Sequence, residues 1–272
     1  MSQQQGSAIP LRRRIYRPYI YLTLVVHIFA IAALFQATQR GIIAFGIVYG
    51  ITGCFGISLG YHRLLTHRTF QAPPWLETFL TLCGAISLQG GPIRWAASHR
   101  AHHRHEDRTG DAHARSRGFL WSHMLWTFMK APNGFRSRHL ARQVPDVASR
   151  PAVAWIERHY VAINLVAHGA LFLAAPLDVF LWAGPARIVA LWHMTWAVNS
   201  IAHGGHDGQS TAESSSRDVP LLALVTFGEG YHRSHHQHPG RAHYTRRALS
   251  VDTGYMILRT LAALRLVAFR TT

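Results

Sequence analysis

The sequence contains very few cysteine, lysine and acidic residues. Its 272 residues include 2 Cys and 12 Asp plus Glu, and Lys130 is the sole lysine. Cys54 and Cys83 stand apart in apolar stretches, which excludes a disulfide scaffold and predicts two buried thiols. A hydrophobic content of 49% excludes a disordered chain. In place of acid and lysine the chain has a net charge of +16, carried almost entirely by arginine, and 20 His.

Long apolar runs predict membrane-spanning helices. Residues 19–35 and 41–60 contain no charged side chain, and each is close to the length that crosses a bilayer as a helix. Only five residues separate these runs, so we expect an antiparallel pair. A second pair is expected at 161–182 and 186–202, with Gly184-Pro185 between them. The shorter run 75–88 contains Glu77 and is expected to be interfacial or buried.

We therefore predict an all-α integral membrane protein with about four transmembrane helices in two hairpins and a cytosolic helical cap. The predicted organisation is a single domain, 1–272. Its parts are a basic N-terminus (1–18), a first hairpin (19–60), a cytosolic segment (61–158), a second hairpin (159–203) and a second cytosolic segment (204–272).

The arginines orient these hairpins. Arg12, Arg13, Arg14 and Arg17 precede the first apolar run, and the segment 62–158 is also rich in arginine. By the positive-inside rule, the N-terminus and both polar segments are cytoplasmic. The same rule accounts for the basic excess, so we expect membrane lipids and no nucleic acid as partners. The first run is expected to stay as an anchor in the cell inner membrane of a bacterium, because no small-residue cleavage site follows it.

Most histidines fall into four ordered groups, all expected on the cytoplasmic side. Positions three and four apart share a helix face, so each HxxHH triplet is predicted to aim three imidazoles in one direction. The five-residue spacing of the first pair places its rings roughly 140° apart on a regular helix, which predicts a helix end or bend, or ligands of different metals. Asn199 lies four residues before the single histidine of the third group, on the same face. The groups are His62 and His67; His99, His102 and His103; His203; and His232, His235 and His236.

Nine imidazoles are too many for one ion and suit two metals of about four to six ligands each, with positions left for oxygen or water. A set of solvated histidines and a structural zinc site are the alternatives; zinc is disfavoured because such sites need four ligands, often with Cys thiolates. His27, His168 and His193 stand singly in apolar runs, where a hydrogen-bonded interior histidine is expected rather than a ligand. None of His105, His113, His123, His206, His238 and His243 is predicted to be a ligand.

The ordered set HRLLTHR, HRAHH, NSIAH and GEGYHRSHH resembles the membrane-bound fatty-acid desaturases, in particular the bacterial members of the acyl-CoA (stearoyl-CoA desaturase-like) branch, from about Tyr61 to the C-terminus. The stretch GDAHARSRGFLWSH at 110–123 is a further match. The resemblance implies a four-span fold with a cytosolic cap, and an oxygen-dependent oxidoreductase that introduces a double bond into a fatty acyl chain. It also implies two iron ions (Fe2+/Fe3+) and O2 as co-substrate. By motif position the iron ligands would be His62, His67, His99, His102, His103, His203, His232, His235 and His236, with Asn199 acting through a water. Gln89 and Trp95 would bind substrate, and no further catalytic residue is implied.

The resemblance also bears on partners and alternatives. A fatty acyl thioester, acyl-CoA, is the expected substrate, although Ala97 and Ser98 replace the Arg and Asp that help to hold coenzyme A in animal members. Acyl carrier protein and membrane lipids are therefore alternative carriers, and hydroxylation or alkyne formation by the same diiron centre is an alternative reaction. The chain has no room for a fused electron-transfer domain. We therefore expect a separate donor of ferredoxin, rubredoxin or cytochrome b5 type with its reductase. A non-catalytic metal carrier would distribute its ligands along the membrane path, whereas these cluster on one side.

Overall fold

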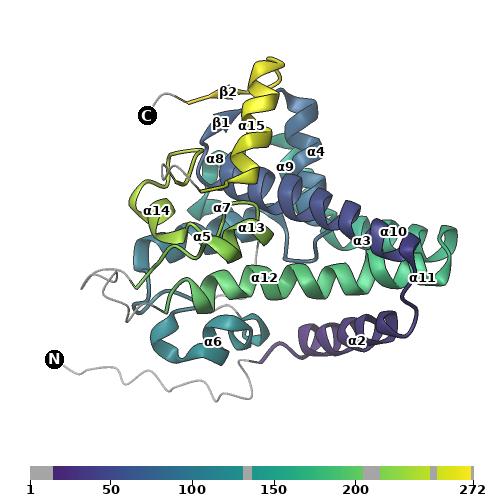
Figure 1. Cartoon of the computed structure of the whole chain (residues 1–272). Helices are drawn as coiled ribbons and strands as arrows, with labels where there is room; N and C mark the ends of the chain where they lie inside the picture. Colours follow the sequence, from purple (N-terminus) through teal and green to yellow (C-terminus); the bar gives the residue numbers. More distant parts are fainter. Residues whose placement is uncertain (1–14, 131–136, 205–214, 246–249, 271–272) are drawn as a thin grey trace.

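The computed structural model describes residues 15–130, 137–204, 215–245 and 250–270. The arginines at 12–14, His206 and residues 207–214 of the polar segment 207–218 lie outside the described residues. Long helices extend to one side of the molecule, and shorter elements gather at their other end (Figure 1). The chain is mostly helical, which confirms the all-α prediction.

Two continuous helices form the first hairpin. Helix α2 (Arg17–Leu34) is followed by α3 (Gln39–Tyr49), whose first turn is capped by the Thr38 hydroxyl, an acceptor for the Gly41 N–H at 3.1 Å. Helix α3 continues without a break into the π-helix η1 (Gly50–Thr66). The stretches Arg17–Leu34 and Gln39–Thr66 are long and apolar enough to cross a membrane, with mean hydropathies of 1.6 and 2.0.

The second hairpin turns at a different place from the one predicted. Helix α10 (Tyr160–Ala174) ends before Pro176, and α11 (Leu177–Leu181), η4 (Trp182–Ala186) and α12 (Arg187–Ile201) follow as one uninterrupted helix. A residue that precedes proline disfavours the helical conformation, so the chain turns at Ala175–Pro176. Pro185 stays inside the helix because the wider π-helical turn η4 relieves the clash that proline causes in a regular α-helix.

Large apolar side chains cover the outside of these helices. They include Ile28 on α2, Ile43 on α3 and Leu173 on α10, each more than half exposed. Side chains of this kind cost free energy in water, so their concentration on the outside of these three helices indicates a lipid-facing surface.

Short helices form the rest of the molecule, at the end of the hairpins where the histidines lie. Proline occupies the first turn of five of them, where its missing N–H costs nothing. The elements are β1 (Phe70–Gln71), α4 (Pro74–Ala85), α5 (Pro92–His105), η2 (Arg115–Arg117), α6 (Phe119–His123), η3 (Leu125–Phe128), α7 (Ser137–Gln143), α8 (Pro145–Ala148), α9 (Pro151–Arg158), α13 (Pro220–Val225), α14 (His232–Gln237), α15 (Thr253–Ala263) and β2 (Ala268–Phe269). Strand β1 pairs with β2 in antiparallel fashion, with Phe70 opposite Phe269.

The core lies where η1 packs against α4. A Cβ at Gly56 would lie 2.5 Å from the carbonyl carbon of Cys83, and a Cβ at Gly60 would lie 2.6 Å from the oxygen of Leu80. Glycine at both positions therefore allows the two backbones to touch. Cys54 and Cys83 are buried free thiols, as predicted. The run 75–88, which was expected to be interfacial or buried, contains most of α4, and α4 packs into this core.

Candidate metal centre

The structure brings together all nine histidines that the sequence singles out, in two groups. The five-histidine group contains His62, His67, His99, His103 and His235, and the four-histidine group contains His102, His203, His232 and His236. Within each group, one ring nitrogen of every member lies within 4.8 Å of one such nitrogen of every other member. The rings come from η1 and the residue that follows it, from α5, from the turn after α12 and from α14, which are distant in sequence.

The π-helix explains the five-residue spacing of the first pair. His62 lies in η1, and His67 is the residue at which this helix ends. A π-helix pairs residues five apart, and the His67 N–H donates to the His62 carbonyl at 3.0 Å. The two rings, which a regular α-helix would separate, therefore meet in one group, with centroids 4.7 Å apart.

The HxxHH triplets do not aim three imidazoles in one direction, so that prediction was wrong. In α5, His99 and His103 enter the five-histidine group, with Nε2 atoms 3.0 Å apart, whereas His102 enters the other. In α14, His232 and His236 enter the four-histidine group at 3.1 Å, whereas His235 enters the five-histidine group. Adjacent helical residues point about 100° apart, so each triplet contributes to both groups.

Acidic side chains that the sequence analysis missed lie behind the imidazoles. The Nδ1 atom of His102 lies 2.8 Å from Asp111, that of His203 lies 3.1 Å from Asp107, and that of His236 lies 2.9 Å from Glu106. In the other group, His62 Nδ1 contacts the Glu229 carboxylate and lies 3.0 Å from the Tyr244 hydroxyl. Proximity in sequence could have indicated these acids. Three of them follow His103 within nine residues, and Glu229 precedes His232 by three residues.

These hydrogen bonds show that the four-histidine group fits a metal ion. A carboxylate accepts from Nδ1–H, so the Nε2 atom of a neutral His102 or His236 carries a lone pair. Burial lowers the pKa of both imidazoles, so both are neutral at pH 7. Their Nε2 atoms nevertheless face each other at 3.3 Å. Two lone pairs at this distance repel unless a cation lies between them.

The spacing suits such an ion. Two imidazoles that bind one metal at right angles, through bonds of about 2.1 Å, have nitrogens about 3 Å apart. The corresponding Nε2 distances are 2.7 Å for His203–His232 and 2.9 Å for His62–His99. Burial also lowers the pKa of His99 and His232, which keeps these rings available as neutral ligands. Imidazole is a ligand for iron, copper, nickel and zinc.

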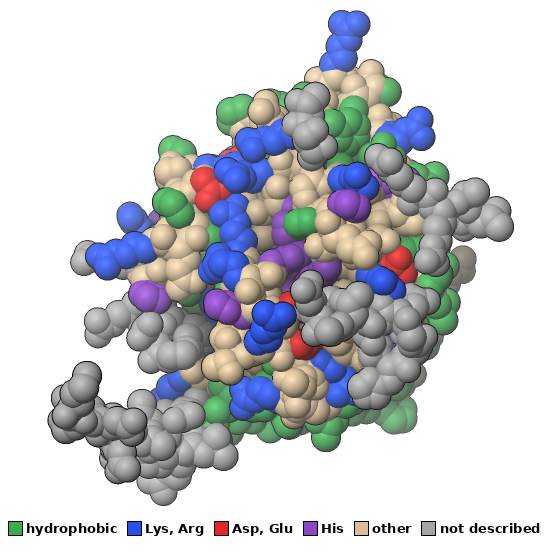
Figure 2. All heavy atoms as spheres, turned by 90° about the vertical axis from the view of Figure 1, so that its left-hand side faces the viewer, with side chains coloured by type: hydrophobic (Ala, Val, Ile, Leu, Met, Phe, Trp, Pro, Cys, Tyr) green, Lys and Arg blue, Asp and Glu red, His purple; other side chains and the backbone are tan. Residues whose placement is uncertain are grey.

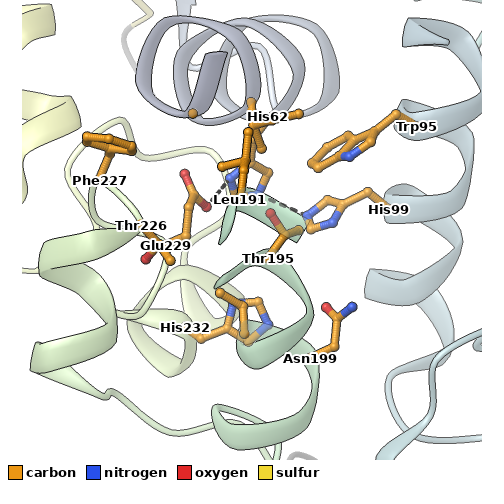
Figure 3. A pocket seen from close by; sticks show the side chains of 13 residues that line it. His62, Trp95, His99, Leu191, Thr195, Asn199, Thr226, Phe227, Glu229 and His232 are labelled. Atoms are coloured by element: carbon orange, nitrogen blue, oxygen red, sulfur yellow. Dashed lines mark hydrogen bonds and ion pairs between the residues drawn. The ribbon is translucent and has the colours of Figure 1, made fainter. Parts of the chain in front are cut away.

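An apolar cavity opens beside both groups (Figure 3). Its polar lining includes His62, His99, His232, Thr226 and Glu229. Gly53, Ile57, Leu191, Val198 and Phe227 are among its apolar lining residues. Helix α12 contributes Thr195 and Asn199 to the cavity wall.

Of the two residues predicted to bind substrate, Trp95 lines this cavity and Gln89 contacts a residue that lines it. Trp95 stacks on His99, with ring centroids 5.0 Å apart. Gln89 donates from Nε2 to the Thr195 hydroxyl at 3.0 Å, and Thr195 in turn lines the cavity.

The single histidines of the apolar runs are hydrogen-bonded, as predicted, but they are half-buried and not fully interior. His27 Nε2 lies 3.1 Å from His193 Nε2, and His193 Nδ1 lies 3.0 Å from His123 Nε2. His168 Nδ1 donates to the Asn164 carbonyl at 2.9 Å. His113 lies beside the four-histidine group, where its Nδ1 is 3.0 Å from Asp111, the acid that also contacts His102.

Comparison with known proteins agrees with this arrangement. The chain matches the fatty acid desaturase family over residues 40–254. It is 37% identical to an sn-2 palmitoyl-lipid 9-desaturase of Nostoc sp. (strain 36), over 76% of this chain and 73% of the relative. It is 36% identical to an sn-1 stearoyl-lipid 9-desaturase of Anabaena variabilis (81% and 80%) and 30% identical to an icosanoyl-CoA 5-desaturase of Limnanthes douglasii (89% and 68%). The chain belongs to the fatty acid desaturase family, whose members are membrane-associated oxidoreductases that act on fatty acyl chains.

Proposed function

We propose that this chain is an oxygen-dependent fatty acyl desaturase that uses a diiron centre held by its nine clustered histidines. The overall reaction converts –CH2–CH2– in the acyl chain to –CH=CH–. It consumes one O2, two protons and two externally supplied electrons, and it releases two molecules of water. The observation that carries the proposal is the contact between two groups of buried and half-buried imidazoles and one apolar cavity.

The protein residues have three tasks in this proposal. The five-histidine group and the four-histidine group each hold one iron ion, and Asn199 supports the second ion through a water. When bound, iron supplies the oxidising power to remove hydrogen from an unactivated methylene. The cavity holds one carbon–carbon bond of the acyl chain beside His62, His99 and His232, and its apolar wall excludes water. Trp95 fixes the orientation of the His99 ring by stacking on it.

The membrane arrangement follows the two hairpins. We propose that the regions 19–60 and 159–203 cross the inner membrane as four spans. The single domain 1–272 then places its N-terminus (1–18), the segment 61–158 and the segment 204–272 in the cytoplasm, with the metal centre on that side. The exposed apolar side chains of α2, α3 and α10 support lipid contact of both hairpins.

The acyl carrier is proposed from the relatives. The two cyanobacterial relatives are named for acyl chains on lipids and for position 9, so a membrane glycerolipid acyl chain desaturated at position 9 is the first substrate to test. The absence of the Arg-Asp pair at Ala97 and Ser98 is in line with a lipid carrier. Acyl-CoA is the second candidate, because the Limnanthes relative is named for an acyl-CoA.

The electron donor is proposed to be a separate acidic protein of ferredoxin, rubredoxin or cytochrome b5 type. Figure 2 shows histidine side chains at the centre of the face formed by the shorter helices, with Lys and Arg side chains around them. Exposed arginines near the second histidine triplet, such as Arg104 and Arg108, would attract an acidic partner to this face.

The test is expression of the full chain in a bacterial host that supplies a donor, with analysis of lipid-bound and CoA-bound acyl chains. We expect a new monounsaturated acyl chain that His102→Ala abolishes. The matched control is His238→Ala, which removes an exposed histidine outside both groups and should keep the product. A hydroxylated product, with one oxygen gained and no hydrogen lost, would contradict desaturation but retain the diiron site.

A further inference from the structure

The two histidine groups differ in the charge behind their rings. Three of the four rings in the four-histidine group contact a carboxylate through Nδ1; the pairs are His102–Asp111, His203–Asp107 and His236–Glu106. Within the part of the chain that the structure describes, Glu229 on His62 is the one carboxylate placed in this way in the five-histidine group. The four-histidine group therefore has three acids behind it and the larger group has one.

The charge of that single acid is also shared with a cation. Glu229 accepts a hydrogen bond from the Ser58 hydroxyl at 2.6 Å and lies 3.5 Å from Nη1 of Arg63, a fully buried guanidinium. Asp111 instead accepts from the backbone N–H groups of Asp107 and His113, at 3.0 and 3.1 Å, and lies 3.0 Å from His113 Nδ1. Backbone N–H groups orient the carboxylate without adding a full positive charge. Arg63 is itself paired with Asp252, at 2.9 and 3.0 Å, so the difference between the two groups is the number of acids behind their rings, three against one.

This difference acts on a bound metal because imidazole is neutral. A buried ion held only by neutral ligands keeps its full positive charge in a medium that solvates charge poorly. A carboxylate behind an imidazole compensates that charge, fixes the tautomer that presents the Nε2 lone pair, and makes the ring a stronger donor. Ring number does not offset the effect, since a fifth neutral ring adds no charge.

We propose that the two metal positions are unequal, and that the four-histidine group binds its iron more tightly because Asp111, Asp107 and Glu106 act as positioning residues behind its ligands. The five-histidine group, with Glu229 shared by Arg63, releases its iron first. The inference rests on the proposed function, in which each group holds one iron ion.

The test is an anaerobic competition with a ferrous chelator on the iron-loaded full chain in detergent, with residual iron per protein as readout. We expect two steps of one iron each. Asp111→Asn keeps the shape of the side chain but removes its charge, and should lower the affinity of the tighter step about 10–100-fold. The matched variant Glu229→Gln should shift the weaker step and leave the tighter one in place.

Mössbauer spectra of 57Fe-loaded protein separate this role from a merely structural one. Asp111→Asn should change the signal of the iron that survives partial chelation and leave the other signal unchanged. Glu106→Gln tests the same group through His236 if Asp111→Asn does not accumulate as folded protein.

The outcomes are distinct for the two proposals. Loss of both irons in one step, or an effect of Asp111→Asn on the weaker step, overturns the inequality and leaves the diiron centre intact. A wild-type protein that never retains two irons overturns the diiron proposal, and the inequality with it.

Discussion

Arg63 is a sharp test of how the metal centre is supported. Its side chain is fully buried and forms a paired contact with Asp252, at 2.9 and 3.0 Å to the two carboxylate oxygens. The same guanidinium donates to the Ala242 carbonyl at 3.1 Å and lies 4.0 Å from the centroid of the Tyr244 ring. It thereby ties the end of η1 to the C-terminal segment.

Arg63→Met removes the cation and leaves Asp252 buried without it. Breaking a buried pair from one side costs about 3–5 kcal/mol, so the Tm in detergent should fall by roughly 10 °C. Adding Asp252→Asn should restore part of the loss, because the unpaired charge is gone and an Asn can still cap α15 through the Tyr255 N–H.

The control is Arg104→Met, which replaces an exposed arginine and should change stability by less than about 0.5 kcal/mol. A Tm for Arg63→Met equal to that of Arg104→Met would refute the reasoning. So would a double variant no more stable than Arg63→Met.

Two further predictions concern packing and pH. Gly56→Ala should destabilise the protein by about 1–3 kcal/mol, because its Cβ would overlap backbone atoms of α4, whereas a Cβ at Gly46 meets nothing within 4 Å. Equal Tm values for Gly56→Ala and Gly46→Ala would contradict this packing. Burial lowers the pKa of His99, His102 and other clustered rings below the usual 6.5. The unfolded chain therefore binds more protons below pH 6.5, and the free energy of unfolding should fall steeply as pH drops from about 6.5 to 5. A Tm of the metal-free protein that does not change over this range would show that the rings titrate normally.

Much of the site could be predicted from residue type and spacing. The four ordered histidine groups identified all nine rings that the structure clusters, because a set of imidazoles at helical spacings has few other uses. The apolar runs at 19–35 and 41–60 identified the first hairpin, since helix length and hydropathy are local properties.

The division of the rings between two groups was decided by tertiary structure. A triplet on one helix indicates a face, but whether His102 joins His99 or His203 depends on where other helices place their rings. The π-helical geometry of η1, which unites His62 with His67, likewise has no local sequence signature and is stabilised by packing against α4.

The sequence by itself determined which chemical groups are present: many imidazoles, few acidic side chains, and apolar helices long enough to cross a membrane. Only the tertiary structure decided how the few acids are used, with Asp107, Asp111 and Glu106 behind one group and Glu229, shared with Arg63, behind the other. The physical reason is that charge compensation acts through contacts of a few ångströms between segments far apart in the chain, and spacing along one helix does not encode those contacts.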